Sequence, residues 1–228
     1  MEAEKSQNHG EISLSHHGVL FLDELPEFNK NVLELLRGPL EDKTVTISRL
    51  NMAITYPCNF IFMASMNPCP CGYYGALDKE CTCKPEQIKR YRNKISGPLL
   101  DRIDLHIGVE TVKYQNLNHD LKIETSKSIR KRVNEARGIQ LERYKKYQIY
   151  SNAELTPKLV EKYCKLDSKG RQILENAFEK LGLSARAYVR ILKVARTIAD
   201  LDKTEKIKIN HLAEAIQYRS LDRKYWGN

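Results

Sequence analysis

Two adjacent carboxylates, Asp23 and Glu24, are the residues of this sequence best placed to do chemistry. They follow directly on the apolar run Gly18–Leu22. A short apolar run without alternation is typical of a strand buried on both faces, usually in a parallel sheet. Pro26 ends the strand, because proline cannot donate to a ladder. The two acids then point to different sides of the strand's C-terminal end, which is where open α/β sheets bind their ligands.

An Asp–Glu pair in this position has a specific use in nucleotide hydrolysis. The first carboxylate can hold Mg²⁺, directly or through water, and the second can orient and deprotonate the attacking water. The alternative is structural, with both acids capping the next helix. The pair alone favours neither interpretation, and motifs further along the chain decide between them.

Four of the six cysteines fall within fifteen residues, in the pattern C-x-C…C-x-C: Cys69, Cys71, Cys81 and Cys83. In a reducing compartment such a cluster is more typical of a metal site than of disulfides. Zn²⁺ prefers four thiolates in a tetrahedron and can close a loop too small to have its own core. The usual spacing within a pair is two residues, so free thiols packed in a loop are the alternative. Cys58 and Cys164 are expected to be plain buried residues.

Composition bounds the class of protein. The 228 residues carry 38 Lys and Arg against 29 Asp and Glu, a net charge of +9, which leans toward a polyanionic partner. That length has room for one or two domains. No apolar run approaches the roughly 18 residues of a membrane span, and residues 1–11 do not form a signal peptide. We therefore expect a cytoplasmic protein without membrane contact. Its residues 1–10 are expected to form a disordered leader.

Periodicity predicts an α/β part followed by an all-α part. The first is expected to contain a helix over 29–41, a hairpin of strands 44–48 and 52–56, an apolar strand 59–65, a basic helix 85–95 and a strand 103–109. Beyond residue 110 the chain becomes basic, and helices are predicted near 125–147, 157–165, 168–181, 185–201 and 210–219. Asn29 and Asn210 suit N-caps, Pro157 a first turn, and Gly182 a helix stop.

Four motifs together resemble the magnesium-chelatase-like AAA+ ATPases, in the ComM/YifB competence-protein branch. They are Gly18–Phe28, Met66–Gly72, Ser96–Leu105 and Ser184–Ala187, in the family's order and with its spacing. The resemblance covers roughly residues 10–220. It implies a partial AAA+ core over 11–112, in which a parallel sheet carries helices and a helix-2 insertion hairpin. It also implies a helical lid domain over 113–228.

The resemblance also implies roles for single residues. Asp23 and Glu24 match the Walker B pair, and Asn67 matches the sensor that positions water against the γ-phosphate. Arg102 resembles the arginine finger that reaches into a neighbouring subunit. Arg186 resembles the second sensor arginine of the lid, with Arg190 as second choice. A guanidinium suits both places, because it stabilises the charge that phosphoryl transfer spreads over the γ-oxygens.

Each of these residues could instead have a purely structural role. Asp101–Asp104 could be a surface ion-pair cluster, and Asn67 a turn residue before Pro68. An arginine of 186–196 could simply bind the lid to the core. The hairpin over 41–56 matches an insertion that faces the central channel of related hexameric motors. Arg49 and Lys43 would then meet the phosphates of a threaded strand, the alternative being a surface ribbon.

One expected motif is absent. No G-x-x-x-x-G-K-[ST] occurs, although phosphates need the backbone amides and Lys of that loop. In AAA+ sheets the strand that carries it lies between those ending at Asn67 and beginning at Ile103. We therefore interpret the chain as the C-terminal portion of a longer ATPase. Alone, it is expected neither to bind nor to hydrolyse ATP appreciably, and ATP and Mg²⁺ belong to the full-length protein.

The leading hypothesis is that the chain forms part of a hexameric ATP-driven DNA motor. The resemblance implies branch migration or helicase work during integration of incoming DNA, and basic segments over 84–102 and 113–147 fit phosphate contacts. A second hypothesis is the ATPase subunit of a metal-ion chelatase, which shares the catalytic positions. A third is a non-catalytic, zinc-stabilised interaction module, which the absent phosphate loop favours.

Overall fold

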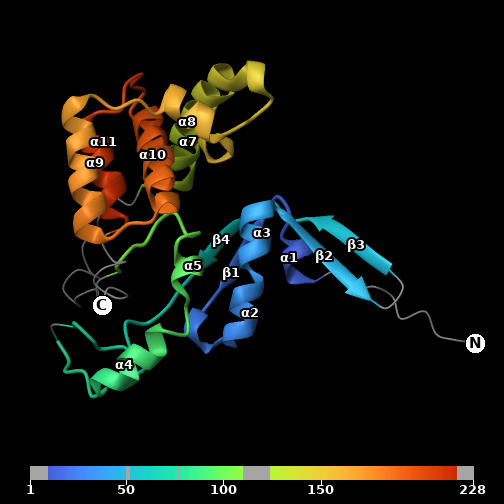
Figure 1. Ribbon diagram of the computed structural model, residues 1–228, viewed down its shortest axis with the longest axis vertical. Coiled ribbons are helices and arrows are strands. Elements are labelled where there is room, and N and C mark those ends of the chain that lie inside the picture. The colour runs from blue at the N-terminus through green and yellow to red at the C-terminus, as the bar shows by residue number, and fades with distance from the viewer. Residues whose placement is uncertain (1–9, 50–51, 77, 110–123, 220–228) are drawn as a thin grey trace, which may run out of the picture. The chain divides into compact units, whose positions relative to one another are not determined.

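The computed structural model describes residues 10–49, 52–76, 78–109 and 124–219 (Figure 1). The chain divides into two compact units, residues 1–103 and 104–228. The first combines short strands with helices and the second is helical, so the predicted order of an α/β part and an all-α part is confirmed. The expected leader, residues 1–10, lies almost wholly outside the described residues.

Unit 1 contains a pair of parallel strands. β1 (Val19–Leu22) pairs with β4 (Ile61–Ala64) in a register that runs from Val19 opposite Ile61 to Leu22 opposite Ala64. The predicted strand before Asp23 is therefore confirmed, and both strands end at the same edge. Its expected burial on both faces is wrong: Leu20 is buried, whereas Val19 and Phe21 are 55% and 54% exposed. Within the described residues nothing covers that second face.

The predicted helix over 29–41 is two helices. α2 (Lys30–Leu35) ends at Leu36, and α3 (Arg37–Asp42) follows at once. Pro39 explains the break, because it has no N–H for the Leu35 carbonyl and its ring would clash there. The predicted N-cap is confirmed, since the Asn29 side chain accepts from the Asn31 amide at 2.9 Å. Two short segments flank β1: α1 (Glu11–Leu14) and the 3₁₀ turn η1 (Leu25–Glu27).

The predicted hairpin is confirmed. β2 (Thr44–Arg49) and β3 (Met52–Pro57) pair antiparallel from Thr44 opposite Pro57 to Arg49 opposite Met52, and the ribbon projects from the unit (Figure 1). The hydroxyls of Thr46 and Thr55 are 2.8 Å apart on one face.

Two helices close unit 1: α4 (Pro85–Arg92) and α5 (Gly97–Leu100). The strand predicted over 103–109 does not form, and its described residues are irregular. The prediction of a strand here is wrong: a strand needs a neighbour to accept its hydrogen bonds, and composition alone does not provide one. Two backbone hydrogen bonds are found for the described residues of this segment: the Ile103 amide donates to the Leu100 carbonyl at 3.0 Å, and the His106 amide to the Tyr218 carbonyl at 2.9 Å.

Unit 2 is a helical bundle. Its elements are α7 (Ser126–Tyr144), the 3₁₀ turns η2 (Lys145–Tyr147) and η3 (Asn152–Glu154), α8 (Pro157–Tyr163), α9 (Ser168–Leu181), α10 (Ala185–Leu201) and α11 (Ile209–Gln217). Pro157 opens α8, and Gly182 ends α9 at φ +60, both as predicted. The expected N-cap at Asn210 is wrong: Lys208 caps α11, and its amide donates to the buried His211 ring.

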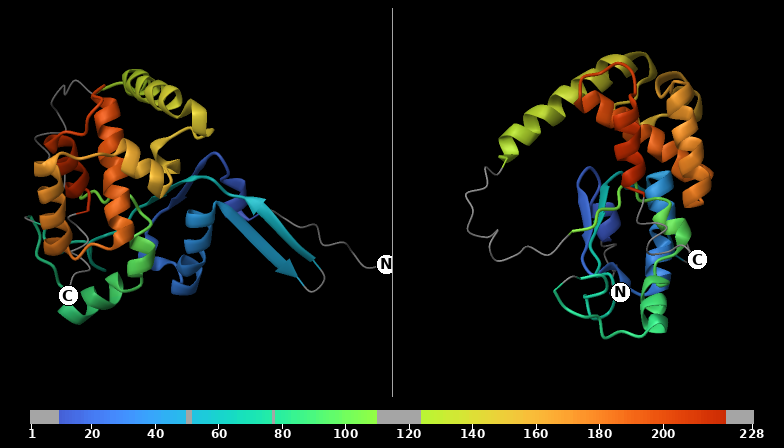
Figure 2. Two further views of the ribbon diagram at one scale, coloured as in Figure 1. Left: turned by 45° about the horizontal axis from the view of Figure 1, so that its top comes forward. Right: turned by 90° about the vertical axis from the view of Figure 1, so that its left-hand side faces the viewer.

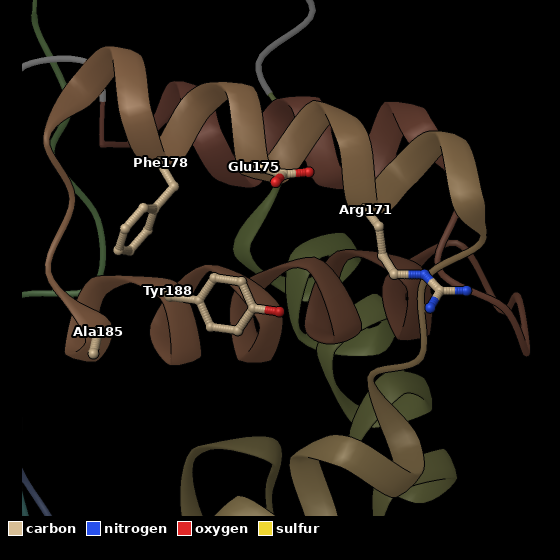
Figure 3. A pocket seen from close by; sticks show the side chains of 5 residues that line it. All are labelled: Arg171, Glu175, Phe178, Ala185 and Tyr188. Carbon is tan, nitrogen blue, oxygen red and sulfur yellow. The ribbon is translucent and has the colours of Figure 1, made fainter.

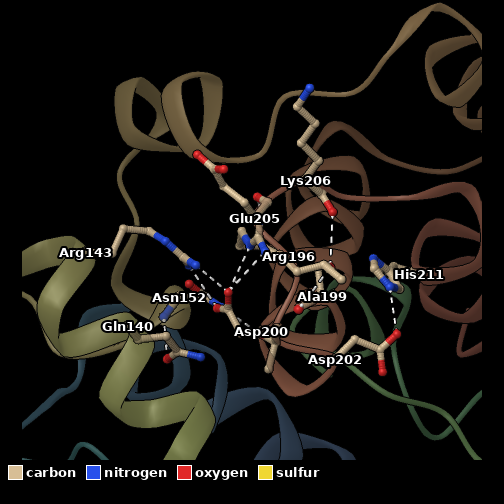
Figure 4. A network of polar contacts seen from close by, with 12 residues as sticks. Gln140, Arg143, Asn152, Arg196, Ala199, Asp200, Asp202, Glu205, Lys206 and His211 are labelled. Carbon is tan, nitrogen blue, oxygen red and sulfur yellow. Dashed lines mark hydrogen bonds and ion pairs between the residues drawn. The ribbon is translucent and has the colours of Figure 1, made fainter.

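A buried carboxylate ties α7 to α10 inside unit 2. Asp200 is 1% exposed and accepts from both terminal nitrogens of Arg143, from Arg196 Nε at 3.2 Å and from Asn152 Nδ2 at 2.8 Å (Figure 4). Asn152 in turn accepts from the Tyr144 hydroxyl at 2.6 Å. The network fixes the C-terminal half of α7 against α10, which begins at Ala185.

Within the described part of the chain, no helix is long and apolar enough to cross a membrane.

Candidate nucleotide and metal sites

Asp23 and Glu24 lie where β1 and β4 end together. The Ser65 hydroxyl, one residue beyond β4, donates to the Asp23 carboxylate. The Glu24 amide lies 3.1 Å from that carboxylate and 3.3 Å from Ser65 Oγ, and the Leu25 amide donates to the Ser65 carbonyl at 2.9 Å. Glu24 adopts a left-handed conformation at φ 51. Because both acids are exposed, their carboxylates can accept a cation and a water from outside the unit.

Asn67 belongs to the same edge. It lies two residues beyond Ser65, and its backbone donates to Tyr91, a buried residue of α4. Burial raises the pKa of the Tyr91 hydroxyl, the Asn67 bond opposes that shift, and the negative charges of Glu27 and Glu24 raise it further. Ser65, which contacts Asp23 and the Leu25 amide, lies two residues before Asn67, so the acid pair and the Asn67 backbone lie at one end of the strand pair. The structure therefore brings together three of the four predicted catalytic residues.

The fourth, Arg102, points into its own unit. Its side chain is 7% exposed and pairs with Glu41. It also donates to the Arg37 carbonyl at 3.1 Å and to the Pro98 carbonyl at 2.7 Å. These contacts hold Arg102 against α3. A finger role would require the guanidinium to leave them, so that role stays a prediction.

The two lid arginines share one face of α10. Arg186 is exposed in the first turn, where the Ser184 side chain caps the helix by accepting from the Ala187 amide at 3.1 Å. Arg190, one turn later, pairs with Asp104. A shallow groove between α9 and α10 begins beside Arg186, at Ala185 (Figure 3). Its floor is apolar, with Phe178 and Tyr188 edge to face at 6.3 Å between ring centroids. This position fits a lid sensor, whose role stays a prediction.

The two cations predicted to meet nucleic acid lie at opposite ends of the hairpin. Arg49 is the last residue of β2, whereas Lys43 precedes the first and holds a left-handed conformation at φ 55. They are six positions apart along an extended chain, a backbone separation of about 20 Å. The Lys43 carbonyl accepts from the Cys58 amide at 2.8 Å, which closes the base of the ribbon. Arg49 therefore lies near the tip of the hairpin and Lys43 at its base.

The four clustered cysteines converge. All four Sγ atoms lie within 4.8 Å of one another, and Cys69, Cys71 and Cys81 are separated pairwise by 3.4, 3.5 and 3.6 Å. Tetrahedral zinc with Zn–S bonds of about 2.3 Å places its sulfurs about 3.8 Å apart. A disulfide would require about 2 Å, and all six cysteines are free thiols. The cluster therefore has the spacing of a tetrathiolate metal site.

The cysteine thiols of the cluster have pKa values shifted in opposite directions, because neighbouring sulfurs interact. A hydrogen bond from the Tyr73 backbone lowers the pKa of Cys71 to about 5. The pKa of Cys81 is raised to about 12: the Cys83 backbone opposes the rise, but burial and the Cys71 and Cys69 sulfurs outweigh it. Four thiolates cannot coexist at this distance without a cation. Cys58 and Cys164 are 1% and 3% exposed, which confirms the prediction of plain buried residues.

Sequence reasoning missed three residues of these sites: Ser65, Tyr91 and Arg92. Ser65 carried a signal, because it is a polar residue at a strand end beside the acid pair. Tyr91 and Arg92 gave none, since they read as ordinary members of a basic helix. Arg92 is 7% exposed and donates twice to the Pro68 carbonyl, at 3.1 and 3.0 Å.

An acid pair and a sensor-type asparagine at one sheet edge, followed by a helical unit with arginines at a helix start, define a partial AAA+ core with a helical domain. The family described as "Magnesium chelatase, subunit ChlI" matches residues 2–117, and "Magnesium chelatase, subunit ChlI C-terminal" matches residues 123–219. The chain belongs to this magnesium chelatase subunit ChlI family.

Curated relatives are found among bacterial proteins. The competence protein ComM of Haemophilus influenzae is 49% identical over 215 residues, or 94% of this chain and 41% of that protein. The uncharacterized YifB proteins of Salmonella typhimurium and Escherichia coli are 46% and 45% identical over the same shares. The chain thus spans about two fifths of the length of the relatives it matches.

Proposed function

We propose that this chain supplies the water-activating edge and the lid of an AAA+ ATPase whose phosphate loop lies in another segment of the same protein. The observation that carries the proposal is the contact between Asp23 and Ser65 at the shared end of β1 and β4, with Asn67 beside it. This is where an open α/β sheet binds its ligand. One relative is named a competence protein, and work on DNA is the purpose that we propose for the ATPase.

The residues of unit 1 divide the chemistry. Asp23, oriented by the Ser65 hydroxyl, would hold Mg²⁺, which supplies charge neutralisation at the phosphates. Glu24 would accept a proton from the attacking water, and Asn67 would orient that water. Arg186 and Arg102 would bring positive charge to the γ-phosphate, the latter in a neighbouring subunit of a ring, as in a hexamer. Because the chain has no phosphate loop, we expect it to show no ATPase activity of its own.

A basic stripe on α7 is the described surface that best supports a DNA partner. Five exposed cations lie along α7 and at the start of the η2 turn that follows it; they are Lys127, Arg130, Lys131, Arg137 and Lys145. None of the five makes an ion pair with a described residue, whereas Arg132 on a flank pairs with Glu124. The N-terminal half of α7 extends away from the other helices of its unit (Figure 2). The stripe is about 27 Å long, enough to follow several phosphates.

The salt dependence of DNA binding tests this partner. Changing Lys127, Arg130, Lys131 and Arg137 to Gln should lower the slope of log K against log salt by about 3 to 4 on duplex DNA, because each lost phosphate contact removes about 0.9. The matched control changes four exposed lysines elsewhere in unit 2 to Gln: Lys158, Lys165, Lys169 and Lys206. Fluorescence anisotropy on the purified chain gives both slopes. Equal losses in the two variants would show that only net charge matters and would overturn the α7 surface.

A chelatase ATPase is the second candidate, because the family description names that activity. It would use the same acid pair and the same lid arginines, so the two candidates differ in partner and not in chemistry. DNA-stimulated ATP hydrolysis by the complete protein favours the DNA motor. Stimulation by a metal-inserting partner complex, with none by DNA, would favour the chelatase.

A further inference from the structure

The loop between β4 and α4 has little to hold it in place except its cysteines. Its described residues form only turns and bends, and Tyr73, Tyr74, Asp78, Lys79 and Glu80 are exposed. Cys69 is the exception, with no exposed surface. A segment of this kind cannot stabilise one conformation by apolar burial, because it buries almost none. A tetrathiolate metal site at its two ends would close it.

The loop is attached to the candidate sensor from three directions. Cys69 follows Asn67 by two residues. A Cβ added to Gly72, whose φ is +84, would lie 4.0 Å from Asn67 Cγ and Oδ1, so the loop passes beside the Asn67 side chain. The Tyr74 amide donates to Cys69 Sγ at 3.3 Å. This hydrogen bond brings the chain after Gly72 back to Cys69.

α4 supplies the third attachment. It begins two residues after Cys83, and its last two residues return to the start of the loop. Arg92 donates through Nε and Nη2 to the single Pro68 carbonyl, and its guanidinium stacks on Tyr74 at 4.7 Å from the ring centroid. Tyr91 receives the backbone hydrogen bond of Asn67. The second cysteine pair therefore anchors the helix that holds the backbone of residues 67 and 68.

We propose that Cys69, Cys71, Cys81 and Cys83 bind one Zn²⁺, and that this site clamps the backbone on which Asn67 is presented to the acid pair. The sulfur spacing fits tetrahedral thiolate coordination, and a four-thiolate set selects a soft metal over Mg²⁺. With four protein ligands the site is closed, so the metal has a structural role. The contribution of this zinc clamp to ATP hydrolysis rests on the proposed function. The zinc site itself and its effect on the loop do not.

Metal analysis of the purified chain tests the site. We expect about one zinc per chain in the wild type, a loss of most of it in Cys81→Ser, and full retention in Cys58→Ser, a matched change at a buried cysteine outside the cluster. Co²⁺ added to the metal-free chain should give the intense visible absorption of tetrahedral thiolate coordination, which also reports on a variant that folds poorly. A wild-type chain with reduced thiols and no zinc, or one that carries iron instead, would overturn the proposal.

Hydrogen exchange tests the clamp without reference to ATP. Removal of the metal by a chelator should speed exchange of the amides in residues 65–74 and 85–95 at least tenfold, while α9 and α10 keep their protection. These helices serve as the internal control for global unfolding. Unchanged exchange at 65–74 after complete metal removal would leave a zinc site with no hold on Asn67, and the clamp would be wrong. Neither result depends on whether the complete protein hydrolyses ATP.

Discussion

At the scale of single residues, the contact between Asp23 and Ser65 has the clearest consequence. A carboxylate that accepts a hydroxyl hydrogen bond keeps one orientation, and its remaining lone pairs stay directed away from the serine. Ser65 sits at this point because β1 and β4 are in register at Leu22 and Ala64. Ser65 is therefore a positioning residue for the magnesium-binding carboxylate of the proposed site.

Changing Ser65 to Ala should weaken Mg²⁺ use without abolishing hydrolysis. Loss of one hydrogen bond to a charged group costs about 1.5–3 kcal/mol, so the Mg²⁺ concentration for half-maximal ATPase activity of the complete protein should rise by about tenfold or more. Ser65→Thr, which keeps the hydroxyl, should restore most of the affinity. A magnesium titration of steady-state ATPase provides the measurement. An equal fall in the maximal rate of both variants, at unchanged magnesium dependence, would mean that Ser65 only fills space.

The candidate site was predictable where a residue's neighbours along the chain define its role. Asp23 and Glu24 follow an apolar run, and Asn67 follows another, so strand-end logic finds all three. Tyr91 could not be found in this way, because its contact with Asn67 arises from packing between a helix and a loop some twenty residues apart in sequence. The inward orientation of Arg102 was equally hidden, since Glu41 reaches it only after Leu36 redirects the chain.

At the scale of elements, Asp200 ties α7 to α10 near the C-terminal end of α10. Two guanidiniums, from Arg143 on α7 and Arg196 on α10, converge on a carboxylate with no exposed side-chain surface. Arg143 is 16% exposed and Arg196 2% exposed. Among the described residues, Asp200 is the one acid that forms an ion pair with either guanidinium. Burial lowers the pKa of Arg143, but the Asp200 hydrogen bonds outweigh it and raise the pKa above its ordinary value.

Replacing Asp200 by Ala should destabilise unit 2 strongly. Removing one partner of a buried ion pair costs about 3–5 kcal/mol, because it leaves a buried charge uncompensated. Urea unfolding of the purified chain, followed by far-ultraviolet circular dichroism, measures the loss as a lower midpoint of the helical transition. Glu161→Ala on α8 is the control, since this exposed acid makes no hydrogen bond or ion pair with a described residue and should change stability by less than about 0.5 kcal/mol. Similar midpoints for the two variants would contradict the role given to the network.

The elements were predictable in proportion to how local their determinants are. α9 and α10 begin and end at the expected residues, because Asp167 and Ser184 cap them and Gly182 separates them. The helix over 29–41 was predicted as one piece because the apolar spacing continues through Leu36, although Pro39 breaks it. The strand over 103–109 failed for a non-local reason: a strand forms against a partner, and composition alone does not provide one.

At the scale of the whole molecule, two units of different character carry different parts of the proposed chemistry. The acid pair, Asn67 and the cysteine cluster belong to unit 1, whereas Arg186, Arg190 and the α7 stripe belong to unit 2. In the proposed ATPase, Arg186 of unit 2 would sense the nucleotide whose hydrolysis the acids of unit 1 would assist. The net charge of +9 favours a polyanionic partner, and five exposed cations that make no ion pair with a described residue lie along α7 and η2.

The central claim is that Glu24 activates the water that hydrolyses ATP in the complete protein. The most direct test compares Glu24→Gln with Glu27→Gln, a nearby exposed acid that pairs with Lys94 at 3.6 Å. Single-turnover hydrolysis, measured beside ATP binding, should show a loss of at least about a hundredfold for Glu24→Gln with binding retained. Glu27→Gln should keep nearly full activity. Undiminished hydrolysis by Glu24→Gln, with nucleotide bound as in the wild type, would contradict the account.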